Sequence, residues 1–230
     1  MKNKIVSQKE WIKNRKLFLK KEKEFTKLRD KFTAKLRQLP WVTVEKEYWF
    51  EGPNGRESLK DLFGTQSQLI VYHFMLGPDW EQGCKNCSFW ADSFQGIPIH
   101  LAHRDVSFVA ISRAPFEKIA HFRKRMGWNF NWVSSYGSDF NYDFNVAFTE
   151  DEIEAGKAIY NFSSTSDVAD EMHGISVFYK DKKHIYRTYS TYSRGLDIFN
   201  GAYNFLDIAP KGRDEKKSHP TNWLRHHDKY

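Results

Sequence analysis

The sequence has little of what several protein classes require. Its 230 residues include only two cysteines, too few for the disulfide framework of a small secreted domain. The longest apolar runs, residues 69–74 and 108–111, have the length of a strand, whereas a membrane span needs roughly 18 apolar residues. Since the first residues also lack the apolar core of a signal peptide, we expect a cytoplasmic location and no membrane partner.

Cofactor motifs are missing as well. No glycine-rich phosphate loop occurs, nothing supports flavin or nicotinamide binding, and no Ser–His–Asp arrangement can be named. We therefore expect no cofactor. The two cysteines, Cys84 and Cys87, therefore remain as the main candidates for catalytic residues.

Positive charge is concentrated at the start of the chain. Residues 1–37 hold 14 lysines and arginines against 4 acidic residues, and the remaining residues hold 22 against 25. The body is therefore close to neutral, and nucleic acid is not expected as a partner.

Residues 7–38 are expected to form one long basic helix. Ser7 with Glu10 three residues later forms a capping-box pattern, and Pro40 stops the helix. Its charged face is expected to be solvated, with a partner surface or a self-association arm of a homo-oligomer as the alternatives. The apolar residues at near-helical spacing are Trp11, Leu17, Phe18, Phe25, Leu28, Phe32 and Leu36.

The body alternates between strands and helices and then ends in a hairpin and a helix. This order predicts an α/β fold of the thioredoxin-like type, with a mixed sheet covered by helices on both faces. Residues 163–170 are weakly patterned and are expected to be a mobile insert. The predicted strands are 68–75, 106–112, 174–179 and 184–189, and the predicted helices are 84–94, 115–126 and 196–206.

Three parts are expected along the chain. A basic helical extension covers residues 1–39, a thioredoxin-like domain covers residues 40–210, and a charged tail covers residues 211–230. His226 and His227 lie in this tail, where we expect a solvated end.

Cys84 and Cys87 form a Cys-x-x-Cys motif that follows a buried strand and a glycine-bearing loop and opens a helix. Free backbone N–H groups and the helix dipole stabilise a thiolate at that position. Lys85 adds positive charge. Cys87 lies one turn deeper, where it can attack a mixed disulfide formed on Cys84. The pattern predicts Cys84 as nucleophile and Cys87 as resolving thiol.

Two alternatives remain for the cysteine pair. Cys84, Cys87, His100 and His103 have a spacing close to that of a zinc finger, although the histidines are one residue too close together. The pair can also be buried and inert, as free cysteines often are. The chain would then be a non-catalytic binding protein with a thioredoxin fold.

Long aromatic runs give the sequence a family resemblance. The stretch GPDWEQGCKNCSFWADSF at residues 77–94, further runs at 103–128, 132–144 and 186–215, and the ending WLRHHDKY are involved. Together they resemble the thioredoxin-like family known as domain of unknown function 899, whose members are described as predicted dithiol–disulfide oxidoreductases. The resemblance implies a thioredoxin fold and a redox role for Cys84 and Cys87.

Two features of related enzymes are missing. Thioredoxins place a cis-proline just before the strand that faces the active cysteines, yet residues 172–174, which precede the matching strand at 175–179, include no proline. Glu81 stands where the peroxiredoxin motif has threonine, and Pro78 lies six residues before Cys84. The missing proline makes a small-molecule disulfide or peroxide a more plausible substrate than a peptide, although a protein disulfide stays open as a partner. The missing peroxiredoxin motif gives no support to direct peroxidase activity. A cellular thiol is the expected reductant.

Four residues near the cysteines are candidates for substrate binding. Trp80 and Trp90 flank the pair, and Arg113 follows a buried strand where α/β proteins often place site residues. Tyr142 lies in the polar and aromatic loop at residues 139–143. Core packing and surface ion pairs are the competing interpretations of these side chains.

Overall fold

The computed structural model describes residues 3–218 and 220–230, and it contains two compact units, residues 1–40 and residues 41–230. The first unit contains helix α1 (Gln8–Leu36), as predicted. The Ser7 hydroxyl accepts a hydrogen bond from the backbone N–H of Glu10 at 3.2 Å, which caps the helix. Along the whole of this helix, every residue is at least partly exposed. In the described part of the chain, no helix is both long and apolar enough to cross a membrane.

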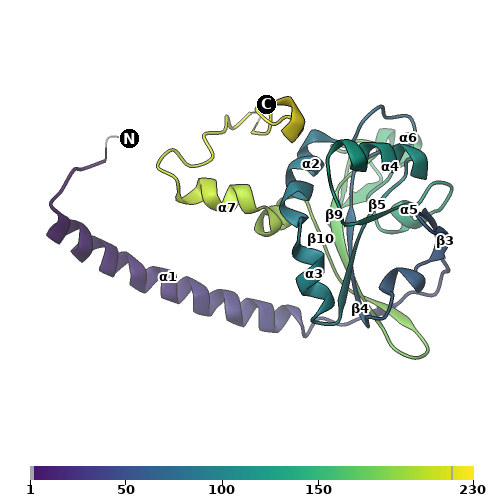
Figure 1. Ribbon diagram of the computed structural model, residues 1–230, viewed down its shortest axis with the longest axis horizontal. Helices are drawn as coiled ribbons and strands as arrows, with labels where there is room; N and C mark the ends of the chain where they lie inside the picture. The colour runs from purple at the N-terminus through teal and green to yellow at the C-terminus, as the bar shows by residue number, and fades with distance from the viewer. Residues whose placement is uncertain (1–2, 219) are drawn as a thin grey trace. The chain divides into compact units, whose positions relative to one another are not determined.

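The second unit is built on a mixed sheet (Figure 1). In the described residues this sheet has eight strands in the order β1-β10-β9-β4-β5-β6-β2-β3. Its central strand β4 pairs parallel with β5 and antiparallel with β9. The strands are β1 (Val42–Thr43), β2 (Trp49–Gly52), β3 (Gly55–Ser58), β4 (Gln68–His73), β5 (Val106–Ser112), β6 (Asn131–Ser134), β9 (Gly174–Lys180) and β10 (Ile185–Tyr192).

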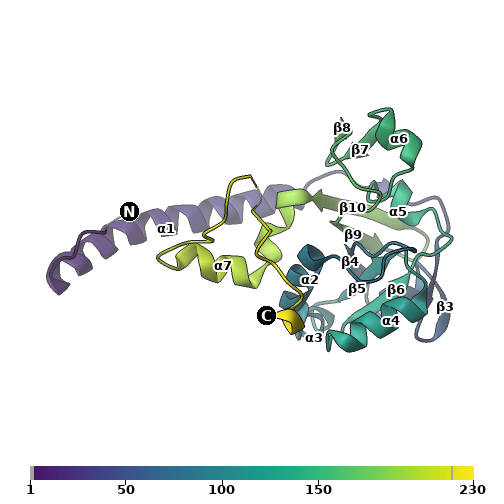
Figure 2. The ribbon, with the colours of Figure 1, turned by 90° about the horizontal axis from the view of Figure 1, so that it is seen from above.

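Helices cover both faces of this sheet, as predicted. Figure 2 shows α2, α3 and α4 on one side of it and α5 and α6 on the other. The helices of this unit are η1 (Asp61–Phe63), α2 (Lys85–Ala91), η2 (Asp92–Phe94), α3 (Ile97–Ala102), α4 (Phe116–Arg125), α5 (Phe140–Asp143), α6 (Glu150–Glu154), η3 (Ser193–Phe199), α7 (Gly201–Ile208) and η4 (His227–Lys229).

Alternate residues of the central strands supply two separate cores. Tyr72 and Ala110 face a cluster that contains side chains of α2 and α4, whereas Val71 and Val109 face a cluster that contains Phe140 of α5. Both faces of β4 are therefore covered, which explains its nearly continuous apolar sequence. The order β4-α2-β5, followed later by β9 and β10, confirms the thioredoxin-like fold.

Two segments contain structure that the sequence did not predict. The stretch at residues 163–170, which is weakly patterned in sequence, contains strand β8 (Ser163–Thr165), which pairs with β7 (Ala158–Tyr160). The single closing helix predicted at residues 196–206 is instead η3 followed by α7, with a break at Asn200. The amide oxygen of Asn200 accepts a hydrogen bond from the backbone N–H of Tyr203 at 2.9 Å, so this residue starts a new helix.

Asn200 gives a test of this break. Asn200→Ala removes the cap of α7 and should lower the free energy of unfolding by about 1 kcal/mol, as measured by urea denaturation. Asn200→Ser keeps an oxygen that can accept the same hydrogen bond and should retain most of the stability. Equal losses in the two variants would contradict the capping role.

Candidate active site

The cysteine pair sits directly beyond the carboxyl end of β4. The chain leaves this strand, forms a loop over residues 74–83, and returns so that the Cys84 backbone N–H donates to the Met75 carbonyl at 3.0 Å. Gly83 makes this return possible, since a Cβ at that position would lie 2.6 Å from the Phe122 ring and 2.7 Å from the Phe74 ring. Helix α2 then begins with Cys84 as its N-cap residue.

The environment of Cys84 favours its thiolate. Its pKa is lowered to about 7, chiefly by a hydrogen bond with the Cys87 thiol. The backbone N–H groups of Cys87 and Asn86 and the charge of Lys85 act in the same direction, while burial opposes them. Cys84 is partly exposed and its thiol is free. It is therefore an acidic thiol that a substrate can reach.

Cys87 has the opposite character. It is buried, with 2% of its surface exposed, and its thiol is also free. Burial raises its pKa well above the usual value, and the neighbouring Cys84 raises it further. Two donors counteract this effect, the Met75 backbone N–H and the Tyr72 hydroxyl. The two thiols thus differ in acidity and in access, although they lie one helical turn apart.

Two tyrosines complete the buried side of the pair, and neither was anticipated from the sequence. The Tyr72 hydroxyl donates to the Cys87 carbonyl oxygen at 3.2 Å. The Tyr160 hydroxyl donates to the His173 carbonyl at 2.9 Å and accepts from the Ser193 backbone N–H at 3.0 Å. Burial raises the pKa of both tyrosines, so both remain neutral donors at neutral pH.

His173 is buried at the start of β9. It directly precedes this strand, which pairs with β4, and its ring centroid lies 6.1 Å from that of Trp90. Burial lowers the pKa of His173, which favours the neutral imidazole. A neutral aromatic side chain therefore lies beside Trp90 in the segment where the sequence lacks a proline.

The four predicted substrate-binding residues fall into two groups. Trp80 packs on Gly77, where a Cβ would lie 2.9 Å from the indole, and the Arg113 guanidinium lies 4.7 Å from the centre of the Tyr142 ring. Trp90 belongs to the core and donates from its indole to the Leu196 carbonyl at 2.8 Å. Its other neighbours are Asn86 and His173, with which it lines a separate pocket.

A buried carboxyl group joins the first of these groups. Glu171 Oε1 lies 3.1 Å from a guanidinium nitrogen of Arg113, but neither carboxylate oxygen has a hydrogen bond of good geometry. Burial raises the pKa of Glu171 to about 8, and the Arg113 charge offsets only part of that effect. Glu171 also lies next to Gly77, where a Cβ would be 3.5 Å from its Cγ. The Arg113–Glu171 ion pair therefore stabilises the loop that precedes the cysteines at Gly77, and not the cysteines directly.

The C-terminal segment folds back onto the cysteine loop, so the expectation of a solvated end is wrong. Leu224 and His226 are buried, and His226 Nε2 lies 2.8 Å from the Gly83 carbonyl oxygen. Because a carbonyl can only accept, Nε2 carries the proton. His226 Nδ1 then faces the Arg125 guanidinium at 3.4 Å as an acceptor. These two contacts select one neutral tautomer of the ring.

Further contacts hold the same segment along α2. The Asn86 amide donates to the Thr221 hydroxyl at 3.3 Å, and His227 Nδ1 lies 2.7 Å from Asp92 Oδ1. Arg125 forms two hydrogen bonds with Asp228, at 2.9 and 3.0 Å. Figures 1 and 2 both place this segment beside α2. The segment therefore contacts residues before, between and after the two cysteines.

The zinc alternative is not supported. In the described part of the chain, no three histidine, cysteine or acidic side chains converge as metal ligands. Cys84 and Cys87 lie at the start of α2, and His100 lies in the last turn of α3, where it is exposed. His103 follows that helix and is exposed as well. The four predicted ligands are not brought together.

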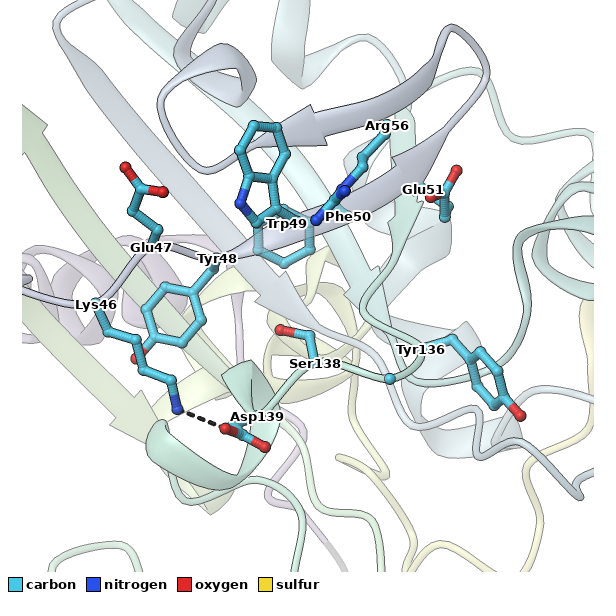
Figure 3. A pocket seen from close by; sticks show the side chains of 11 residues that line it. Lys46, Glu47, Tyr48, Trp49, Phe50, Glu51, Arg56, Tyr136, Ser138 and Asp139 are labelled. Atoms are coloured by element: carbon cyan, nitrogen blue, oxygen red, sulfur yellow. Dashed lines mark hydrogen bonds and ion pairs between the residues drawn. The ribbon is translucent and has the colours of Figure 1, made fainter.

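A second pocket, of about 380 Å³, lies beside strand β2 (Figure 3). Lys46 Nζ binds Asp139 Oδ2 at 2.6 Å and Asp143 Oδ2 at 2.8 Å, and the Tyr48 hydroxyl donates to Asp143 at 2.8 Å. The polar loop at residues 139–143 therefore binds Lys46 rather than facing the cysteines. Neither cysteine lines this pocket.

Comparison with known proteins gives a family and several structures. The model of a family described as bacterial protein of unknown function (DUF899) matches residues 1–230. No curated protein matches significantly. Similar solved structures include a PrxQ mutant from Xylella fastidiosa, with 11% identity over 71% of this chain and 94% of that chain and a TM-score of 0.46. The peroxidoxin BcpB from Mycobacterium tuberculosis has 15% identity over 70% of this chain and 93% of that chain, with a TM-score of 0.47. A putative thiol:disulfide interchange protein DsbE from Chlorobium tepidum has 12% identity over 73% of this chain and 94% of that chain, with a TM-score of 0.41.

The acidity of Cys84 can be measured by alkylation. At pH 7 a thiol of pKa about 7 is half ionised, compared with roughly 3% for a free thiol, but its thiolate is about fivefold less nucleophilic. At pH 7, Cys84 should therefore react with iodoacetamide about threefold faster than free cysteine. The rate of this reaction should decrease as the pH is lowered, with a midpoint near pH 7. In Cys84→Ser, the remaining Cys87 should be unreactive at this pH. A Cys84 midpoint near 8.5 would contradict the assignment.

His226 should affect both stability and thiol acidity. His226→Ala leaves the buried Gly83 carbonyl without a partner and should cost about 1–3 kcal/mol in the free energy of unfolding. It should also raise the pH midpoint of Cys84 alkylation, because the loop before the helix loses a fixed contact. His226→Gln can donate from its amide and should restore part of both. His227→Ala, which loses only an exposed contact, is the control; equal effects in His226→Ala and His227→Ala would contradict the positioning role.

Proposed function

We propose that this chain, which belongs to the bacterial family of unknown function DUF899, is a thiol–disulfide oxidoreductase. Cys84 is the nucleophile and Cys87 is the resolving thiol. The observation that carries the proposal is the asymmetry of the pair. Cys84 is acidic and accessible, whereas Cys87 is buried and has a high pKa. Disulfide exchange needs one reactive thiol that attacks the substrate and a second thiol that resolves the mixed disulfide.

The first step is attack by the Cys84 thiolate on one sulfur of a substrate disulfide R–S–S–R. A bond forms between Cys84 Sγ and that sulfur, the substrate S–S bond breaks, and one thiolate leaves with the electron pair. The position of Cys84 at the N-terminus of α2 favours the attacking thiolate, and the backbone N–H groups of Cys87 and Asn86 contribute to its lowered pKa. The product is a mixed disulfide on Cys84.

The mixed disulfide then makes Cys87 more acidic. The hydrogen bond with Cys84 and the Cys84 charge, which both raise the pKa of Cys87, are lost once Cys84 is no longer a thiolate. The Met75 backbone N–H, which lowers the pKa of Cys87, remains, and the Tyr72 hydroxyl stays on the Cys87 carbonyl oxygen. Cys87 can then lose its proton and attack Cys84 Sγ.

This second attack releases the other half of the substrate as a thiolate and leaves a disulfide between Cys84 and Cys87. One substrate disulfide has become two thiols, and two protein thiols have become one disulfide. Two thiol equivalents must reduce this disulfide before the next cycle, and they leave as a disulfide of the reductant. We propose a cellular thiol in this role, which fits a reducing compartment such as the cytoplasm.

The chain can also act through a partner without catalysis. Trp11, Phe18, Phe25 and Phe32 recur every seven residues on α1 and are all more than half exposed. A heptad row of aromatic side chains favours contact with another helix. We propose self-association of α1 as the second candidate; deletion of residues 1–39 should then convert an oligomer to a monomer in light scattering.

The redox proposal predicts different products for two variants. The protein is first reduced and then freed of reductant. With insulin or 5,5′-dithiobis(2-nitrobenzoate) as the only disulfide added, Cys84→Ser should lose exchange entirely. Cys87→Ser should release one thiol per molecule and stall as a mixed disulfide, visible by mass spectrometry. Trp49→Phe, in the pocket beside β2, is the control and should leave exchange unchanged. If wild-type protein exchanges with neither substrate, the proposal is wrong.

A further inference from the structure

A pocket of about 540 Å³ reaches α2 at Asn86, the residue directly before Cys87, although neither cysteine is among its lining residues. Asn86, the residue between Lys85 and Cys87, lies in its wall together with Trp90 one turn later on α2. The opposite walls come from η3, α7 and the C-terminal segment, which follow the last strand of the sheet. The complete lining is Asn86, Trp90, His173, Ser193, Arg194, Asp197, Tyr203, Asp207, Arg213, Glu215, Pro220 and Thr221.

The floor of the pocket is aromatic and rigid. The ring centroids of Trp90 and Tyr203 lie 5.5 Å apart in an edge-to-face arrangement. Hydrogen bonds hold both rings, from the Trp90 indole to the Leu196 carbonyl at 2.8 Å and from the Tyr203 hydroxyl to Glu215 at 2.8 Å. Such a floor can pack the apolar part of a ligand without reordering.

One arginine in the wall is fully engaged. Arg213 makes two hydrogen bonds to Asp207, at 2.7 and 2.9 Å, and a third to Asp197 at 3.0 Å. Its guanidinium also lies 3.8 Å from the centre of the Tyr203 ring. Arg213 therefore fixes the wall and has little capacity left for a ligand.

The rim offers one available charge of each sign. The Arg194 side chain is 86% exposed, and its one ion-pair partner among the described residues is Asp197, at 3.2 Å, which is a weak surface pair. Glu215 Oε1 accepts from Tyr203 and from the Trp223 indole, and within the described residues Glu215 has no cationic partner. A ligand with charges of a single sign would be repelled by one of these groups, whereas a zwitterion would satisfy both.

We propose that this pocket binds the organic part of a low-molecular-weight disulfide that carries both an ammonium and a carboxylate group. The inference rests on the proposed function and names its substrate class. The disulfide bond of the ligand lies toward Cys84, its carboxylate pairs with Arg194, and its ammonium pairs with Glu215. The exchange steps are those above, with each half of the ligand leaving as a thiolate.

The surroundings favour a small ligand over a protein. Thr221 contacts Asn86 directly, so the C-terminal segment closes the side from which an extended chain would approach. The segment before β9 lacks the proline that presents backbone to peptides. A volume of about 540 Å³ also matches a ligand of drug size.

Three disulfides test the charge requirement. Cystine carries both charges on each half, cystamine carries only ammonium groups, and 3,3′-dithiodipropionate carries only carboxylates. The kcat/KM of the full-length protein for cystine should exceed that for either of the others by about tenfold, and cystine should be a better substrate than insulin. Similar values for the three small disulfides, or faster reaction with insulin, would overturn the inference.

Single substitutions separate the two ends of the ligand. Arg194→Gln should raise the KM for cystine and dithiodipropionate by about two- to fivefold and leave cystamine unchanged, while Glu215→Gln should impair cystine and cystamine only. Arg104→Gln is the matched control, because Arg104 is exposed and lies just before the amino end of β5, whereas the cysteines follow the carboxyl end of the parallel strand β4. Iodoacetamide alkylation of Cys84 should be unchanged in all three variants, because that reagent does not need the pocket.

The outcomes distinguish the two levels of the argument. If disulfides are exchanged but neither pocket variant changes selectivity, the substrate assignment fails and the oxidoreductase proposal stands. If Cys84 is unreactive toward iodoacetamide and toward every disulfide, the oxidoreductase proposal fails and the substrate assignment fails with it.

Discussion

The site depends on the close packing at Gly83. A methyl group there would overlap the rings of Phe74 and Phe122, which belong to the end of β4 and to α4. Only with this packing can the Cys84 backbone N–H reach the Met75 carbonyl. Phe74 after β4, Phe122 of α4 and His226 of the C-terminal segment all pack around Gly83. These contacts fix the position at which α2 begins.

The same placement gives the two thiols their different properties. Cys84, as N-cap residue, lies at the positive end of α2 and remains partly exposed. Cys87 points one turn deeper into a cluster that also contains Tyr72 and Trp90. The difference arises largely within the pair, because the hydrogen bond with the Cys87 thiol lowers the pKa of Cys84, while burial and the neighbouring Cys84 raise that of Cys87.

Much of this framework could be predicted from the sequence, because the evidence was local. Continuous apolar runs marked β4 and β5, and the glycine-bearing loop before Cys84 marked the start of α2. The contacts made by Tyr160, Glu171 and His226 could not be predicted, because their partners are distant in the chain. Trp80, Trp90, Arg113 and Tyr142 remain predictions as substrate-binding residues, and nothing in their spacing showed that Trp90 lines a separate pocket.

His226 and Gly83 are 143 residues apart in the chain. During synthesis, the cysteine pair leaves the ribosome well before the histidine that holds its loop. At about 5–20 residues per second, this interval lasts on the order of ten seconds. During this interval the nascent chain contains both cysteines, but the contact between His226 and the Gly83 carbonyl has not yet formed. The complete site can therefore form only after His226 has been synthesised.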